Sequence, residues 1–226
     1  MHPSHSTTKT APRLPDPSVV RRAALTLAAA AVLLLAIAAQ SSAQPAAKTR
    51  VTVIGDSVTA SFNYVAAAKR YLGKGLDLHS DAVVCRRLVA TSCPYQGSTP
   101  STALDVVTAD GHGLGPVVVI NVGYNDWVAV YDVDRVMRAL RAAGVHTVIW
   151  VTLKEVGSYA SIYAQTNARI RSAGAKWRRS MVVADWNAYS RGKPWFSEDG
   201  LHLTPTGAMR LARFLRPLVL AGTASA

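Results

Sequence analysis

VTVIGDSVTA, residues 51–60, joins an apolar run to the sequence Gly-Asp-Ser and decides how the rest of the chain is interpreted. The apolar residues end at Gly55, which predicts a buried strand over 50–55 and a helix over 58–73. Ser57 therefore falls at the turn from strand to helix. A serine there is commonly a helix N-cap, but the same position can also present a reactive hydroxyl. These ten residues leave both roles open.

The remaining sequence alternates apolar runs with amphipathic stretches. Because the apolar runs are nearly continuous, they predict a parallel sheet of about five strands that is covered by helices on both faces. In such sheets the functional site forms at the carboxyl ends of the strands. The further strands are expected over 76–84, 116–123, 145–153 and 180–186, and the further helices over 101–109, 132–144, 159–177 and 206–220.

The N-terminal residues have the layout of an export signal. Residues 1–22 are polar and end in Arg21-Arg22, residues 23–39 carry no charge, and Ser41-Ser42-Ala43 is a small-residue cleavage site. We therefore expect a signal over 1–43 and a single domain over 44–226. An uncleaved anchor over 23–39 is the alternative, although this stretch is mostly alanine. Either arrangement places the domain outside the cytoplasmic membrane, secreted or held at the cell envelope.

Residues 44–226 are basic, with 21 of the 25 Lys and Arg and 12 of the 13 Asp and Glu, a formal charge of +9. That charge favours association with an anionic cell envelope. A solvated helix face explains part of it, because Arg135, Arg138 and Arg141 recur at helical spacing. No nucleic-acid motif is present, and we expect a monomer.

The sequence holds two cysteines, Cys85 and Cys93. In an exported protein this pair favours a disulfide that closes a short loop over free thiols. The spacing is not that of a metal site, and we expect neither a metal nor an organic cofactor.

Three polar clusters follow strands or precede the last helix: residues 55–57, 123–126 and 199–202. Acyl transfer by serine needs a base, a carboxylate that orients the base, and donors for the developing oxyanion. Asp199 and His202 are three residues apart, so one turn can bring them together. Taken singly, each cluster also has a structural explanation, as a cap, a turn or a half-buried imidazole.

Together, the segments GDSV (55–58), GYND (123–126) and DGLH (199–202) resemble the conserved blocks of the SGNH (GDSL-type) hydrolase superfamily. The resemblance extends over residues 50–218. It implies a three-layer α/β/α, flavodoxin-like fold and a Ser–His–Asp esterase or acyltransferase. By this resemblance Ser57 is the nucleophile, His202 the base and Asp199 its orienting partner.

The resemblance also implies an oxyanion hole made of the Ser57 N–H and the Asn125 amide, to which we assign Gly123 and Cys85 as further members. Cys85 is a departure, because it stands near the position where the family has a glycine. We expect a Cys85–Cys93 disulfide to stiffen this segment.

The closing stretch, residues 182–208, is similar to extracytoplasmic SGNH domains related to cell-envelope O-acyltransferases. Within it, Trp186, Trp195 and Phe196 either line the site or anchor the core. Outside it, Arg86 either contacts a substrate or is a surface charge.

The function expected from these observations is an exported serine esterase. It would hydrolyse acetyl or other short O-acyl esters of a carbohydrate or cell-envelope substrate. Acyl transfer by the same residues is the alternative, and a non-catalytic envelope-binding module is a second one. A lipase is disfavoured because the sequence has no extended apolar lid segment.

Overall fold

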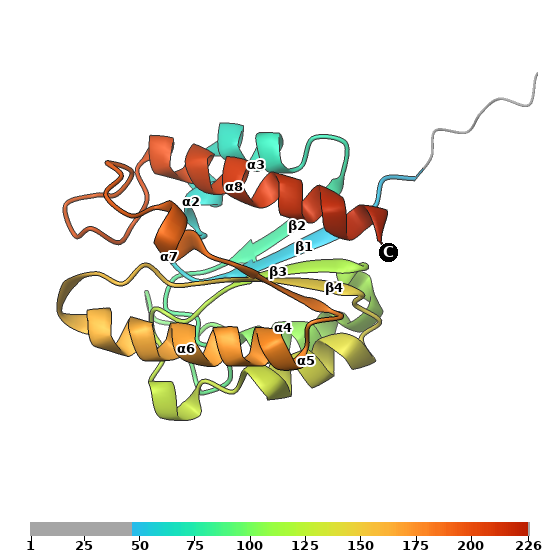
Figure 1. Cartoon of the computed structure of the whole chain (residues 1–226), viewed down its shortest axis with the longest axis horizontal. Coiled ribbons are helices and arrows are strands. Elements are labelled where there is room, and N and C mark those ends of the chain that lie inside the picture. Colours follow the sequence, from blue (N-terminus) through green and yellow to red (C-terminus); the bar gives the residue numbers. More distant parts are fainter. Residues whose placement is uncertain (1–46, 226) are drawn as a thin grey trace, which may run out of the picture. The chain divides into compact units, whose positions relative to one another are not determined.

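A parallel five-stranded sheet is the centre of the computed structural model, which describes residues 47–225. Figure 1 shows the sheet between two layers of helices. The strand order is β2-β1-β3-β4-β5, and every neighbouring pair is parallel. The predicted strands are confirmed, with bounds up to two residues shorter at each end. They are β1 Arg50–Gly55, β2 Asp77–Ala82, β3 Val117–Asn121, β4 Thr147–Val151 and β5 Met181–Ala184.

Helices cover both faces of the sheet, so the fold has the three layers α/β/α that the sequence predicts (Figure 1). One layer holds α2 (Ser61–Tyr64), α3 (Ala66–Leu72) and α8 (Pro205–Ala224), with the short α7 (Trp186–Tyr189) beside them. The other holds α4 (Ala103–Asp110), α5 (Val133–Ala142) and α6 (Ala160–Lys176). Three short 3-10 helices lie at Gly111–Leu114, Val128–Val130 and Gly157–Tyr159.

Each face of the sheet has its own apolar core. Alternate residues of a strand point to opposite faces, so Val53 and Val119 pack under α8 while Ile54 and Val118 pack under the other layer. The central strands are buried on both sides for this reason. The continuous apolar runs of the sequence are therefore the consequence of two cores that share one sheet.

The helix expected over 58–73 is the main difference from the sequence-based prediction. Residues 57–60 form a turn, and two short helices, α2 and α3, follow it with a break at Val65. The Asp56 carboxylate accepts the Val58 N–H at 3.1 Å, which holds the chain in a turn after the strand and delays the helix to Ser61. Ser57 is consequently not a helix N-cap; that position of α2 is Ala60.

The strand ends bring two of the three polar clusters together. Gly55 pairs with Asn121 at the last register position of β1 and β3, so the segments that follow both strands leave the sheet at the same edge. The third cluster returns to this edge in the loop before α8. All three clusters therefore lie at the carboxyl edge of the sheet, where the sequence analysis expects the functional site.

From Lys48 onward the chain forms one compact unit. The export signal predicted over 1–43 lies outside the described residues. Within residues 47–225, no helix combines the length and apolar character needed to cross a membrane.

Candidate active site

Ser57 lies in the turn directly after β1, with its side chain partly exposed. Gly55 makes this turn possible, because a Cβ there would lie 2.3 Å from the Cβ of Thr59. The Ser57 hydroxyl is not used for capping and is instead 3.0 Å from Nε2 of His202. This contact joins residues that are 145 positions apart in the sequence.

His202 is held from its other side by Asp199. Nδ1 of His202 lies 2.5 Å from Oδ2 of Asp199, while Oδ1 of Asp199 accepts the backbone N–H groups of Leu201 and His202. With its proton on Nδ1, facing the carboxylate, the ring presents Nε2 as an acceptor for the Ser57 hydroxyl. Ser57, His202 and Asp199 thus form a continuous chain of hydrogen bonds with the orientation that serine acyl transfer requires.

The Asp199 carboxylate stays ionised at any ordinary pH. Burial acts to raise its pKa, but the hydrogen bonds from the His202 ring and from the N–H groups of Leu201 and His202 outweigh burial and lower the pKa to about 2. The side chains of His202 and Asp199 are 41% and 48% exposed, so the imidazole is open to molecules that arrive from solvent.

Lys154, which the sequence-based reasoning did not single out, supports the loop that carries this pair. Its Nζ donates to the carbonyl of Gly200 at 3.0 Å and lies 3.7 Å from the centroid of the Phe196 ring. Burial lowers the pKa of Lys154. A lysine directly after a predicted strand was the one signal available, and it is a weak one because most such lysines are solvated.

Asp56 is a fully buried carboxylate that connects the first two clusters. Oδ2 accepts the N–H groups of Gly123 and Tyr124, each at 3.1 Å, and Oδ1 accepts the Val58 N–H. Burial raises the pKa of Asp56 to about 6, although these backbone hydrogen bonds act to lower it. Asp56 therefore holds the turn after β1 and also fixes the chain after β3.

Gly123 makes a sharp turn with φ of +149°, where a Cβ would lie 3.0 Å from Leu153 Cδ1. Its N–H is already donated to Asp56, so it is not free to bind an oxyanion. The assignment of Gly123 to the oxyanion hole is therefore wrong for this geometry. Glycine is required there by the turn, not as a donor.

Asn125 faces the segment that follows β2. Its Nδ2 donates one hydrogen to the carbonyl of Arg86 at 3.2 Å, which leaves the second amide hydrogen available for a ligand. The backbone carbonyl of Asn125 accepts the Nε–H of Arg87 at 2.7 Å. The amide and the segment after β2 therefore hold each other in place.

Cys85 and Cys93 form a disulfide in the structure, with Cα atoms 5.1 Å apart. Cys85 has φ of +69°, a left-handed conformation that glycine adopts most easily. The backbone at Cys85 thus has a shape that is uncommon for a residue with a side chain. Among residues 47–225, neither the N–H of Cys85 nor that of Ser57 donates to a protein acceptor.

Arg86 is neither a substrate contact nor a surface charge, the two roles left open by the sequence. Its side chain is buried, and the guanidinium donates to the carbonyl of Asp81 at 2.7 Å, to the Asp81 carboxylate at 3.0 Å and to the carbonyl of Ser101 at 3.0 Å. Arg86 therefore connects the backbone next to Cys85 with Asp81 at one end of the surrounding loop and with Ser101 at the other.

Asp126 adds a second buried carboxylate at this edge. Both of its oxygens accept the N–H of Leu88, at 3.0 and 3.1 Å. Burial raises the pKa of Asp126 to about 7, against the lowering effect of that hydrogen bond. Asp126 thus anchors the far end of the segment 85–88.

The two tryptophans of the closing stretch take one of the two roles that the sequence left open, as anchors of the core. Trp186 and Trp195 are buried and stack with ring centroids 5.9 Å apart, so they anchor the core under α8. Phe196 is partly exposed and lies under the Lys154 ammonium.

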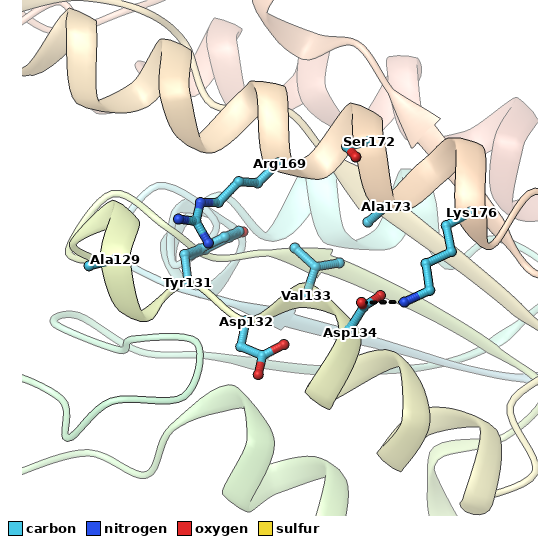
Figure 2. Close-up of a pocket in the computed structure, with 9 residues that line it drawn as sticks. All are labelled: Ala129, Tyr131, Asp132, Val133, Asp134, Arg169, Ser172, Ala173 and Lys176. Atoms are coloured by element: carbon cyan, nitrogen blue, oxygen red, sulfur yellow. Dashed lines mark hydrogen bonds and ion pairs between the residues drawn. The ribbon is translucent and has the colours of Figure 1, made fainter.

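Two cavities differ in their relation to this edge. One, of about 240 Å³, is lined by the 124–127 segment together with Tyr159, Ile162 and Tyr163, and it includes Asn125. Figure 2 shows another, of about 330 Å³, between α5 and α6, where Lys176 pairs with Asp134. None of Ser57, His202 and Asn125 lines this second cavity.

Among the described residues, no group of three or more His, Cys, Asp or Glu could hold a metal ion.

Ser57, His202 and Asp199 thus lie in hydrogen-bond contact at the carboxyl edge of the sheet of a three-layer α/β/α fold, a geometry that serine acyl transfer can use. Solved structures of SGNH hydrolases have this fold. The C-terminal catalytic domain of peptidoglycan O-acetyltransferase A from Streptococcus pneumoniae matches with a TM-score of 0.61 at 21% identity, over 79% of this chain and 96% of that one.

Two carbohydrate esterases match over a similar extent. A carbohydrate acetylesterase family member from Sinorhizobium meliloti has a TM-score of 0.55 at 17% identity, over 76% of this chain and 98% of that one. A family 3 carbohydrate esterase from Clostridium thermocellum has a TM-score of 0.51 at 15% identity, over 79% and 98%. No protein-family model and no curated protein sequence matches this chain. At these identities the solved structures establish the fold.

Proposed function

We propose that this protein is an exported serine esterase that hydrolyses short O-acyl esters, such as acetyl esters, of a carbohydrate or cell-envelope substrate. The observation that carries the proposal is the hydrogen-bond chain from Ser57 Oγ through His202 to the ionised Asp199. The solved structures with this fold include carbohydrate esterases, which supports the choice of substrate class.

In the proposed reaction Ser57 Oγ attacks the ester carbonyl while Nε2 of His202 takes the hydroxyl proton. The tetrahedral intermediate collapses, the bond to the alcohol oxygen breaks, and His202 gives the proton to that oxygen. Water then attacks the acyl-enzyme with His202 again as base, which releases the carboxylic acid and restores Ser57. Asp199 holds the imidazole in the required tautomer throughout and stabilises the imidazolium.

The developing oxyanion would be bound by three donors: the N–H of Ser57, the N–H of Cys85 and the second amide hydrogen of Asn125. The first two have no protein acceptor among the described residues, and the amide has one hydrogen to spare. Removing one such donor typically costs about a hundredfold to a thousandfold in kcat. The disulfide and the Arg86 contacts keep the Cys85 donor in place.

Acyl transfer to a sugar hydroxyl is the second candidate. The likeness to an O-acetyltransferase catalytic domain favours it, and so does the exposed imidazole, which a second alcohol can reach as readily as water. Product analysis with a polysaccharide acceptor separates the two. Acylated acceptor indicates transfer, and free carboxylic acid alone indicates hydrolysis.

The location outside the cytoplasmic membrane rests on the predicted signal, and the Cys85–Cys93 disulfide fits an oxidising compartment. The basic charge supports association with an anionic envelope, and we expect a monomer. Cell fractionation and sedimentation of the purified domain test these points. Recovery from the cytoplasm with free thiols would contradict the export.

The decisive experiment compares wild type with Ser57→Ala on a panel of esters that vary in acyl length and alcohol. We expect Ser57→Ala to lose at least about a thousandfold in kcat, because the three residues act as a unit. Ser172→Ala, an exposed serine on α6, is the matched control and should retain wild-type rates. Wild-type turnover by Ser57→Ala, or absence of labelling by a serine-directed phosphonate, would refute the mechanism; the second result would favour a binding module.

A further inference from the structure

The cavity of about 240 Å³ adjoins the proposed oxyanion site, because Asn125 lines both. Its walls come from segments that follow strands at the carboxyl edge of the sheet. Trp127 stands just before the 3-10 helix Val128–Val130, Tyr159 ends the 3-10 helix Gly157–Tyr159, and Tyr163 lies on α6. A molecule whose ester reaches Ser57 thus has a hollow beside the oxyanion donors.

Two large aromatic side chains of this cavity are turned to solvent. Trp127 is 57% exposed and Tyr159 is 54% exposed. Exposed aromatic surface beside a hollow is a sign of a binding surface, because it costs solubility and gains nothing for the core.

The floor of the cavity is rigid. Tyr163 is nearly fully buried and packs against Tyr124 edge to face, with centroids 5.2 Å apart, and against Tyr159 at 6.3 Å. The Tyr124 hydroxyl accepts the N–H of Lys154 at 2.7 Å. A floor fixed by these contacts is preorganised, so a flat ligand binds without ordering it first.

The chemistry of the lining selects the ligand. Four of the seven lining residues are aromatic, Asn125 supplies an amide, and none of the seven carries a positive charge. A sugar ring matches this combination, since it has an apolar C–H face to lie on an aromatic ring and hydroxyls at its edge for polar groups. The volume suits one ring and is below the usual range of drug-sized sites.

We propose that this aromatic cleft, residues 124–127 with Tyr159, Ile162 and Tyr163, binds the neutral pyranose ring that carries the scissile ester. The proposal rests on the proposed esterase function and assigns its substrate class. An anionic sugar is disfavoured because the lining holds no cationic partner. A fatty acyl chain is disfavoured because Ile162 is the single aliphatic residue of the lining.

The test compares wild type with Trp127→Ala on methyl 6-O-acetyl-glucopyranoside and on ethyl acetate, which has no ring. We expect KM for the sugar ester to rise about tenfold, from lost stacking and lost apolar burial, with ethyl acetate changed less than twofold. Trp127→Phe should recover most of the sugar-ester KM. Tyr71→Ala, an exposed tyrosine on α3, is the control and should change neither substrate.

A binding measurement keeps this proposal separable from the esterase function. Ser57→Ala, titrated with methyl 6-O-acetyl-glucopyranoside by NMR, should bind it, and the Ser57→Ala, Trp127→Ala double variant should bind it about tenfold more weakly. That result supports the cleft even if the wild type hydrolyses no ester. The proposal is overturned if the two variants bind the sugar ester equally, or if Trp127→Ala loses the same activity on the sugar ester and on ethyl acetate. It is also overturned if Trp127→Ala raises KM only for p-nitrophenyl octanoate, which has a long acyl chain and no sugar ring.

Discussion

Replacing Arg86 by methionine tests whether the buried guanidinium is a structural tie. The change keeps the apolar length of the side chain and removes every donor. It leaves the carbonyls of Asp81 and Ser101 without their partners at 2.7 and 3.0 Å, and it leaves the Asp81 carboxylate unpaired. The loop around Cys85 then has fewer contacts with the sheet.

The expected cost follows from burial. Breaking a buried ion pair from one side costs about 3–5 kcal/mol, and the Asp81 side chain, 28% exposed, regains part of its hydration, so we expect the lower half of that range. For a domain of this size, 3–4 kcal/mol corresponds to a fall in Tm of about 10 °C. We also expect kcat to fall about tenfold or more, because Cys85 loses its neighbouring support.

Thermal unfolding and steady-state kinetics on a small ester measure both effects. Arg178→Met is the matched control, since Arg178 is exposed, and its Tm and kcat should equal those of the wild type. A surface charge at position 86 would leave both unchanged. A substrate contact would raise KM at an unchanged Tm. Either pattern would refute the structural role.

Three further predictions concern the same edge. Asn125→Ala should lower kcat about a hundredfold with a small change in KM, and a loss under tenfold in steady-state assays would remove Asn125 from the oxyanion hole. Reducing the Cys85–Cys93 disulfide should lower the unfolding free energy by about 2–3 kcal/mol and reduce the hydrolysis rate; an unchanged rate after proven reduction would show that the bond does not stiffen the donor. Because burial raises the pKa of Asp56 to about 6 and of Asp126 to about 7, the folded state binds more protons than the unfolded chain between pH 4 and 7. The stability that these groups contribute is therefore lost as pH rises through that window. In urea unfolding, the free energy of unfolding of the wild type should increase relative to that of Asp126→Asn as pH falls from 7 to 4.

The strands were predictable because a strand that is buried on both faces has apolar side chains at consecutive positions. Val117 to Asn121 is buried throughout, so its apolar run needed no knowledge of partners. The helix bounds were less predictable, as the turn at 57–60 shows. There a side-chain contact from Asp56 to the Val58 N–H overrides the local preference for helix.

The candidate site divides in the same way. The order of the three motifs pointed to Ser57, Asn125, Asp199 and His202, and the structure brings Ser57, His202 and Asp199 into contact; their catalytic roles stay predictions. The prediction that Gly123 donates to the oxyanion and the two roles predicted for Arg86 do not fit the structure. The hydrogen-bond partners of both residues lie in other segments of the chain, so the local sequence did not reveal them. The Asp56 contact with Gly123 spans 67 positions.

By itself the sequence determined the layer order of the fold, the edge of the sheet at which chemistry is expected, and the reactive residue types. These follow from local periodicity and from the fact that parallel strands end at one edge. Only the tertiary structure decided which backbone N–H groups are free for a ligand, that Cys85 adopts the left-handed backbone of a glycine, and that Trp127 and Tyr159 flank one cleft. Hydrogen bonds and burial are satisfied between distant segments, so no local pattern records them.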